Sequence, residues 1–335
     1  MEPAFGTLAG KRERITRTVL ALLVLLLVVG FNYPVDMPSG RGYDKGQNAI
    51  WLESRWSDTL VPREERWRLA NSLAKQGIRW LYADEGTLRA DGTIPRVNSL
   101  YAGGLTTDVH REQPQMRVLA WMKGYTIGSS GLRLADPLVR ARIVESARYF
   151  TEQQGFDGVH LDIEPVPSND AGYIELLDEM RAGIGRKAIS VAAMKWTPLA
   201  PRLDGLSLLP YSWEGEYYQQ VGQRANQIVL TSYDSAMPFA NLYIKYVSWQ
   251  TNEVLDALRD SPSCQVLIGI PTYHEQRAFY TSPENAGTGL QGVIESLRDQ
   301  QQSGTLPDNF TGVALFGEWT TSGGEWQLYD NIWRK

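Results

Sequence analysis

The sequence predicts an α/β protein with the (β/α)8 architecture of a TIM barrel, preceded by an N-terminal hydrophobic membrane segment. Three observations predict it. The chain has 335 residues, which is long enough for a full buried core. From residue 46 onward, short runs rich in β-branched and aromatic residues alternate with longer stretches of helical periodicity. A basic terminus followed by an apolar run opens the chain.

Eight strand-like segments occur in residues 46–335, and eight βα units are the number that closes a barrel. We expect strands at Asn48–Glu53, Ile78–Asp84, Arg117–Met122, Gly158–Glu164, Ala188–Met194, Ile228–Tyr233, Val266–Ile270 and Val313–Trp319. We expect helices at Arg63–Gln76, Leu138–Gln154, Gly172–Ile184, Asn252–Arg259 and Leu290–Gln301. Two connections are long: Glu85–Gln113, where Asp91-Gly92 indicates a hairpin before a helix, and Thr197–Asn226.

The chain before the barrel domain divides into a basic cytoplasmic tail (residues 1–17), a signal anchor or signal peptide (18–33) and a linker (34–45). The apolar run Val19–Phe31 would span about 20 Å as a helix, against about 30 Å of hydrocarbon core. Residues 34–42 lack a clear A-x-A cleavage pattern, which favours the anchor. The basic flank predicts export of the barrel, either membrane-anchored in the periplasm or at the cell surface, or secreted after cleavage.

Composition excludes several classes of function. The 33 basic and 38 acidic residues give a net charge of −5, and residues 1–17 contribute +2, so the remainder carries −7. An acidic body without a basic stripe argues against nucleic acid as a partner. The single cysteine, Cys264, excludes an intrachain disulfide. A three-histidine metal site would need His110, His160 and His274 together, so we expect no metal and no cofactor. The oligomeric state is not readable from the sequence.

The expected strand Gly158–Glu164 carries the most informative pattern. Side chains alternate between the two faces of a strand, so its three apolar residues face the helices while His160, Asp162 and Glu164 face the barrel interior. Buried charges are costly there unless they are paired, which favours a functional site over a structural one. Asp162 and Glu164 are about 6–7 Å apart along the strand, so their carboxyl groups can interact. Such a pair separates its pKa values, and the outermost member, Glu164, is the candidate general acid.

These residues resemble a known family. Asp157-Gly158 followed by Asp162-x-Glu164 looks like the DGxDxDxE signature on the fourth strand of family 18 glycoside hydrolases, the chitinase family. Further likenesses are Thr231-Ser232-Tyr233-Asp234, which resembles the sixth-strand MxYD motif, Met194 at the end of the fifth strand, and Trp319, where the family places a tryptophan under the sugar. His160 departs from the pattern because it replaces the first aspartate of the DxDxE triplet, and Thr231 replaces a methionine.

The resemblance implies hydrolysis of an N-acetylated polysaccharide by substrate-assisted retaining catalysis. Glu164 would protonate the glycosidic oxygen, and the N-acetyl carbonyl of the substrate would attack its own anomeric carbon. Asp162 would hold the amide N–H, Tyr233 would bind the carbonyl oxygen and Asp234 would bind sugar hydroxyls. As imidazolium, His160 could hold Asp162 ionised, and as neutral imidazole it could accept the Asp162 proton.

Aromatic residues at the expected strand ends are further candidates, because flat rings stack on pyranose faces. They are Trp51, Tyr82, Trp121, Trp196, Tyr273 and Trp319. Together with the family likeness, the candidate substrate-binding set is Asp234, Trp319, His160, Met194, Tyr82 and Trp121.

Two other functions stay open. A retaining glycosidase with two carboxylates about 5 Å apart could use Glu164 and Glu275. A non-catalytic, lectin-like barrel could bind glycans without cleaving them, and His160 is the main support for it. Chitin, peptidoglycan and an N-acetylated exopolysaccharide would all suit the site, and exo or endo action depends on the two long connections.

Overall fold

The computed structural model describes residues 17–25, 39–95, 101–197, 212–273 and 283–334. It confirms the barrel: β1 to β8 are parallel neighbours in sequence order, and β1 pairs with β8 to close the sheet. The strands are β1 Asn48–Leu52, β2 Ile78–Thr87, β3 Arg117–Tyr125, β4 Gly158–Glu164, β5 Ala188–Ala193, β6 Gln227–Thr231, β7 Gln265–Pro271 and β8 Phe310–Phe316.

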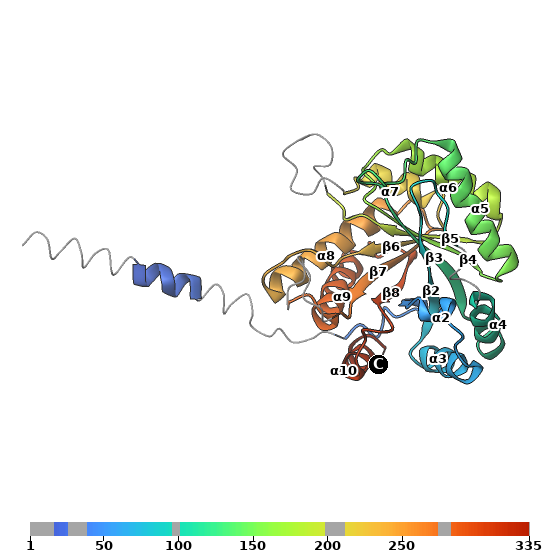
Figure 1. The fold of residues 1–335 in the computed structure, drawn as a ribbon. Helices are drawn as coiled ribbons and strands as arrows, with labels where there is room; N and C mark the ends of the chain where they lie inside the picture. Colours follow the sequence, from blue (N-terminus) through green and yellow to red (C-terminus); the bar gives the residue numbers. More distant parts are fainter. Residues whose placement is uncertain (1–16, 26–38, 96–100, 198–211, 274–282, 335) are drawn as a thin grey trace, which may run out of the picture.

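Helices surround the strands (Figure 1). They are α2 Arg55–Asp58, α3 Arg63–Lys75, α4 Ala102–Glu112, α5 Pro137–Arg148, α6 Ala171–Ile184, α7 Gly215–Gly222, α8 Ala240–Ala257, α9 Ala286–Gln302 and α10 Gly323–Tyr329, with π-helical segments η2 Tyr149–Gln153 and η3 Asp330–Arg334. Two of them lie within the two long connections: α4 follows the Asp91-Gly92 hairpin, as expected, and α7 was not predicted. α8 begins twelve residues before the predicted Asn252. The Asp91-Gly92 turn forms, closed by a hydrogen bond from Arg89 N to Thr93 O (2.8 Å).

Several strand ends differ from the prediction. β2 extends to Thr87, which lies opposite Lys123 of β3, and β3 extends to Tyr125, which lies opposite Glu164 of β4. β6 ends at Thr231, two residues before Tyr233, and β8 ends at Phe316, three residues before Trp319. The chain turns away after β6 because Asp234 adopts a φ of 54° and donates its backbone N–H to a side chain rather than to a neighbouring strand.

The apolar core has two parts. One lies between the strands and the helices and includes Val159, Leu161 and Ile163, so the predicted alternation of β4 is confirmed. The other fills the barrel interior and consists of Ala49, Trp51, Tyr82, Leu119, Trp121, Val229, Leu267 and Ala314. The barrel is therefore closed below its active end by aromatic side chains.

The C-terminal segment closes the opposite end of the barrel. Asn48 Oδ1, at the start of β1, accepts hydrogen bonds from Val313 N (3.0 Å) and from Trp333 Nε1 (3.0 Å). Gly40 N donates to Ile332 O (2.7 Å), and a Cβ on Gly40 would lie 2.8 Å from Trp333. The end of the linker is thus fixed beneath the amino ends of the strands.

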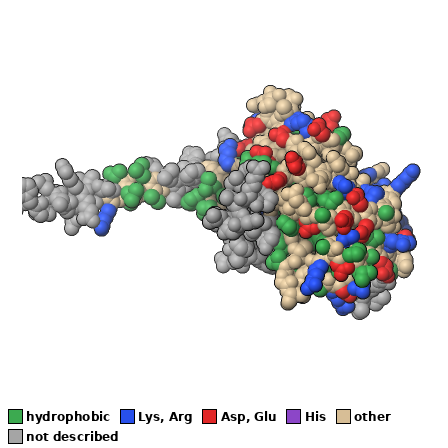
Figure 2. Space-filling model, turned by 90° about the horizontal axis from the view of Figure 1, so that it is seen from above, with side chains coloured by type: hydrophobic (Ala, Val, Ile, Leu, Met, Phe, Trp, Pro, Cys, Tyr) green, Lys and Arg blue, Asp and Glu red, His purple; other side chains and the backbone are tan. Residues whose placement is uncertain are grey.

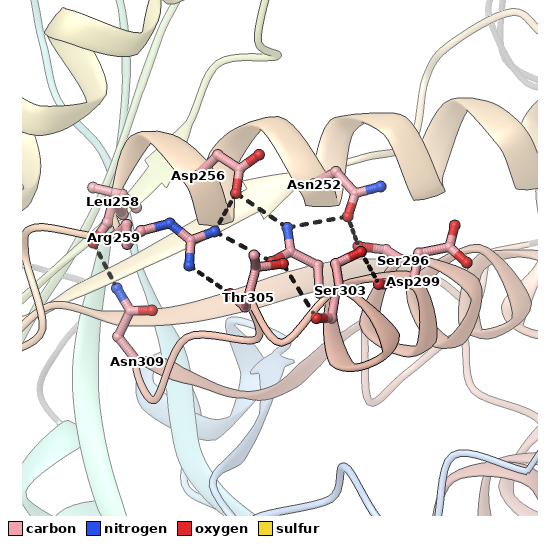
Figure 3. Close-up of polar contacts among 10 residues, drawn as sticks. Asn252, Asp256, Leu258, Arg259, Ser296, Asp299, Ser303, Thr305 and Asn309 are labelled. Carbon is pink, nitrogen blue, oxygen red and sulfur yellow. Dashed lines mark hydrogen bonds and ion pairs between the residues drawn. The ribbon is translucent and has the colours of Figure 1, made fainter.

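Polar contacts join helices α8 and α9 over the outside of the barrel (Figure 3). Asn252 Oδ1 accepts from Ser296 Oγ (2.8 Å), and Arg259 reaches both Asp256 Oδ1 (2.5 Å) and Thr305 O (2.5 Å). These contacts hold the two helices and the segments that follow them against each other. α9 leads into β8 of the barrel.

Residues 17–25 form an exposed helix, and the rest of the apolar segment lies outside the described residues. Within the part of the chain that the structure describes, no helix has the length and hydropathy to cross a membrane. On the described surface in Figure 2, acidic and basic side chains are interspersed.

Candidate active site

The carboxyl end of β4 places two carboxyl groups next to each other inside the barrel. Asp162 Oδ2 accepts a hydrogen bond from Trp121 Nε1 of β3 (2.8 Å). Burial raises the pKa of Asp162, while Trp121, Lys123 and a hydrogen bond from Glu164 lower it. Burial is the largest of these influences, so the pKa of Asp162 lies above its ordinary value, and Trp121 of β3 holds the carboxyl group in place.

Glu164 has the properties of a general acid. Burial, followed by the negative charge of Asp162, raises the pKa of Glu164 to about 8, while Lys195 acts in the opposite direction. The hydrogen bond between the two carboxyl groups raises the pKa of Glu164 and lowers that of Asp162. Glu164 therefore keeps its proton near neutral pH, which is what a general acid needs.

Tyr233 lies beside this pair, just beyond β6. It is buried, and desolvation followed by the charges of Asp162, Asp234 and Glu164 raises its pKa well above the ordinary value. The hydroxyl therefore stays protonated and can donate a hydrogen bond. These interactions place Tyr233 close to Asp162 and Glu164.

Asp234 is fixed by two residues that the family likeness did not identify. Its Oδ1 accepts from the Tyr273 hydroxyl (2.8 Å), and its backbone N–H donates to Glu284 Oε2 (2.8 Å). Glu284 is fully buried and also accepts from the backbone N–H of Ser235 (2.9 Å). Glu284 gave no sequence signal because it lies outside the strands, 50 residues beyond Asp234.

The aromatic residue at the end of β8 is Phe316, not Trp319 as predicted. The Phe316 ring lies 5.4 Å from Trp51, 6.2 Å from Trp121 and 5.5 Å from Tyr233, measured between centroids. Trp319 lies farther out, is 39% exposed, and packs its ring edge on Phe316 (5.5 Å). The partly exposed Phe316 ring thus lies between the rings of Trp121 and Tyr233. Trp319 extends this group of aromatic rings outward.

His160 is a buried residue of the barrel interior. Its ring stacks on Tyr82 (4.0 Å between centroids, 10° between planes). The Ser190 hydroxyl donates to Gln227 Oε1 (2.8 Å), so His160 Nδ1 is the donor to Ser190 Oγ (2.8 Å). Burial lowers the pKa of His160 to about 3, so the ring is neutral. This contradicts the imidazolium role, because the ring carries no charge at ordinary pH.

Three of the predicted substrate-binding residues lie beneath the accessible surface. His160 and Tyr82 are fully buried, and the Tyr82 hydroxyl is occupied by Gln227 Oε1 (2.5 Å). Met194 is 5% exposed, and its carbonyl accepts a hydrogen bond from Tyr218. These residues support the site from below, and direct contact with a sugar does not fit their burial. Trp121 is also mostly buried and contacts Asp162.

Glu275, the second carboxylate of the alternative retaining mechanism, lies outside the described residues. The expectation that no metal binds stays a prediction, although the described residues contain no group of three or more His, Cys, Asp or Glu placed to hold a metal ion.

Residues 96–333 match the family model for glycosyl hydrolases family 18. The chain belongs to this family.

Solved structures share the barrel fold. They include the spore cortex-lytic enzyme SleL of Bacillus megaterium QM B1551 (13% identity, TM-score 0.57, 87% of this chain and 75% of that chain). The family 18 N-acetylglucosaminidase of Paenibacillus barengoltzii has 16% identity and a TM-score of 0.57, over 86% of this chain and 99% of that chain. A class V chitinase of Pseudomonas fluorescens Pf-5 has 11% identity and a TM-score of 0.56, over 85% and 98%.

Proposed function

We propose that this family 18 protein hydrolyses β-glycosidic bonds in an N-acetylated polysaccharide, with the acetamido group of the substrate as nucleophile. The observation that carries the proposal is the Asp162–Glu164 pair at the carboxyl end of β4, where burial and the charge of Asp162 raise the pKa of Glu164 to about 8. Both carboxyl groups lie on one strand, beside a hydroxyl donor from Tyr233.

The proposed reaction has two steps. In the first, the acetamido carbonyl oxygen attacks the anomeric carbon, the glycosidic bond breaks, and the leaving oxygen takes the proton of Glu164. Asp162 accepts the amide N–H, and Tyr233 donates to the carbonyl oxygen. In the second step, ionised Glu164 takes a proton from water, which attacks the anomeric carbon and reopens the ring with net retention.

The acetyl group provides the test. Purified residues 39–335 should cleave N-acetylated oligosaccharides and release the β-anomer first, because two inversions restore the configuration. Matched N-deacetylated oligosaccharides should not be cleaved, and a thiazoline mimic of the cyclised intermediate should inhibit. Equal cleavage of both substrates would contradict the proposal and favour a two-carboxylate mechanism with Glu164 and Glu275.

A glycan-binding function without catalysis is the second candidate. Its support is His160, which is neutral and bonded to Ser190, where the family pattern has an aspartate below the catalytic pair. This candidate predicts that N-acetylated oligosaccharides bind, in calorimetry, with no product over days. Retention of Glu164 favours hydrolysis.

The place of action is part of the proposal. The basic tail and the apolar run Val19–Phe31 support export of the barrel with the N-terminus inside the cytoplasm. A polysaccharide substrate outside the cytoplasm agrees with this arrangement.

A further inference from the structure

A partly exposed ion pair lies beside the Asp162 and Glu164 carboxyl groups, and the proposed mechanism does not use it. Lys123 Nζ of β3 is 2.5 Å from Asp84 Oδ2 of β2, and the two side chains are 26% and 12% exposed. The β3–β4 register places Lys123 opposite Asp162. Paired residues of neighbouring parallel strands are about 4.8 Å apart and point to the same face, so Lys123 and Asp162 share the barrel interior.

The same strand supplies a hydrogen-bond donor to Asp162. Trp121, two residues before Lys123, donates its indole N–H to Asp162 Oδ2 (2.8 Å). The Lys123 ammonium in turn lies 4.8 Å from the centre of the Trp121 ring. A carboxylate in the interior needs both a charge partner and hydrogen bonds, and β3 provides both.

His160 cannot supply that charge. It lies two residues below Asp162 on β4, is fully buried, and directs Nδ1 to Ser190. His160 Nε2 has no hydrogen-bond partner among the described residues, so no bond from it reaches Asp162.

We propose that Lys123, held in place by Asp84, is a positioning residue that keeps Asp162 ionised, while Trp121 fixes the orientation of the carboxylate. In a family whose pattern has an aspartate at position 160, this chain controls the charge of Asp162 from the neighbouring strands. The inference rests on the proposed function for its catalytic meaning, because an ionised Asp162 is what accepts the amide N–H of the substrate.

The groups that face Asp162 determine the expected sign. They are Asp84 from β2, Lys123 from β3, Glu164 from β4, Tyr233 after β6 and Tyr173 from α6. Lys123 is the cation of this set. Its removal should raise the pKa of Asp162, whereas removal of Asp84 should lower it, because one negative charge is lost and Lys123 is no longer neutralised.

The test is a measurement of the Asp162 pKa that does not need turnover. Carboxyl signals of the full chain, labelled with 13C-aspartate and assigned with Asp162→Asn, are titrated in wild type, Lys123→Met, Lys123→Arg and Asp84→Asn. We expect the Asp162 pKa to rise by about 1 unit or more in Lys123→Met, to stay near wild type in Lys123→Arg, and to fall in Asp84→Asn. Lys245→Met is the matched control, since Lys245 pairs with Glu295 (2.7 Å) on the outer helices.

A second measurement addresses catalysis. The acidic limb of the kcat/KM profile should move to higher pH in Lys123→Met and to lower pH in Asp84→Asn, with Lys245→Met unchanged. An unchanged Asp162 pKa in folded Lys123→Met would overturn the inference, and if that variant does not fold, an unchanged or raised value in Asp84→Asn would do so. If wild type hydrolyses no glycan, the proposed function fails, while the carboxyl titration still decides the role of Lys123.

Discussion

At the scale of single residues, His160 is the main departure from the family pattern, and its environment gives it a role in stability. It is stacked on Tyr82 and bonded to Ser190, with no charge at ordinary pH. An aspartate at this position would have to be buried against the same aromatic rings. A neutral imidazole therefore suits this part of the barrel interior, because it packs on an aromatic ring and needs only a hydrogen-bond partner such as the Ser190 hydroxyl.

This environment predicts a pH dependence of unfolding. The folded pKa of about 3 lies below the unfolded value of about 6.5, so protons bind preferentially to the unfolded chain between these values. His160 should therefore cost about 2 kcal/mol of stability as the pH falls from 6.5 to 5. Urea unfolding of wild type and His160→Gln at both pH values measures the difference. Equal pH dependence in the two proteins would contradict a neutral buried His160, whatever the absolute stability of the variant.

Residue roles were predictable where the alternation of one strand carried them. Asp162 and Glu164 follow from the period of β4. Lys123 was missed because the third strand was expected to end at Met122, one residue earlier. Phe316 was missed because the register of β8 is set by pairing with β7, where Phe316 lies opposite Pro271.

At the scale of elements, the loop after β6 depends on the residue before α9. Glu284 accepts the backbone N–H groups of Asp234 and Ser235, and Asn285 then caps α9 through its side chain. The start of one helix thereby fixes the loop that carries Tyr233 and Asp234. No local pattern predicts a contact of this kind, because its partners are far apart in the sequence.

Glu284→Gln tests this dependence. The amide would turn an N–H group toward the backbone N–H donors, which should cost about 1–3 kcal/mol of stability and lower kcat/KM through Asp234. Chemical denaturation and glycan hydrolysis give the two readouts. Glu295→Gln is the control because Glu295 pairs with exposed Lys245. Identical behaviour of the two variants would show that Glu284 does not hold the loop.

At the scale of the whole molecule, the linker and the candidate active site lie at opposite ends of the barrel. Gly40 and Trp333 join the linker and the C-terminal segment beneath the amino ends of the strands. Glu164 ends β4 at the opposite, carboxyl end. An anchored barrel would therefore direct its active end away from the point where the linker attaches.

The barrel class was predictable from the count of βα units, because each unit is a local pattern. The helix α4 was expected after the Asp91-Gly92 hairpin, whereas α7 was not predicted, since it is short and lies within a long connection. The membrane segment stays a prediction, because residues 26–33 of its sixteen residues lie outside the described part of the chain.

Export is tested with a reporter that is active only outside the cytoplasm, fused after Lys335 of the full chain. The basic flank and apolar run predict an active fusion. Removal of residues 1–33 should leave the fusion inactive in the cytoplasm, which serves as the control. An intact but inactive fusion of the full chain would contradict export.

The central claim is that Glu164 donates the proton to the leaving group, and one measurement tests it most directly. Hydrolysis of an unactivated N-acetylated oligosaccharide is compared among wild type, Glu164→Gln and Glu318→Gln, with binding measured on the same samples. Glu318 is the matched control, because it is a partly buried carboxyl group that accepts a hydrogen bond from Trp56 Nε1 (3.1 Å), which glutamine can also accept. We expect Glu164→Gln to lose at least about 100-fold in kcat while still binding, because an amide keeps the shape but has no acidic proton, and Glu318→Gln to stay near wild type. Wild-type turnover by Glu164→Gln would contradict the account.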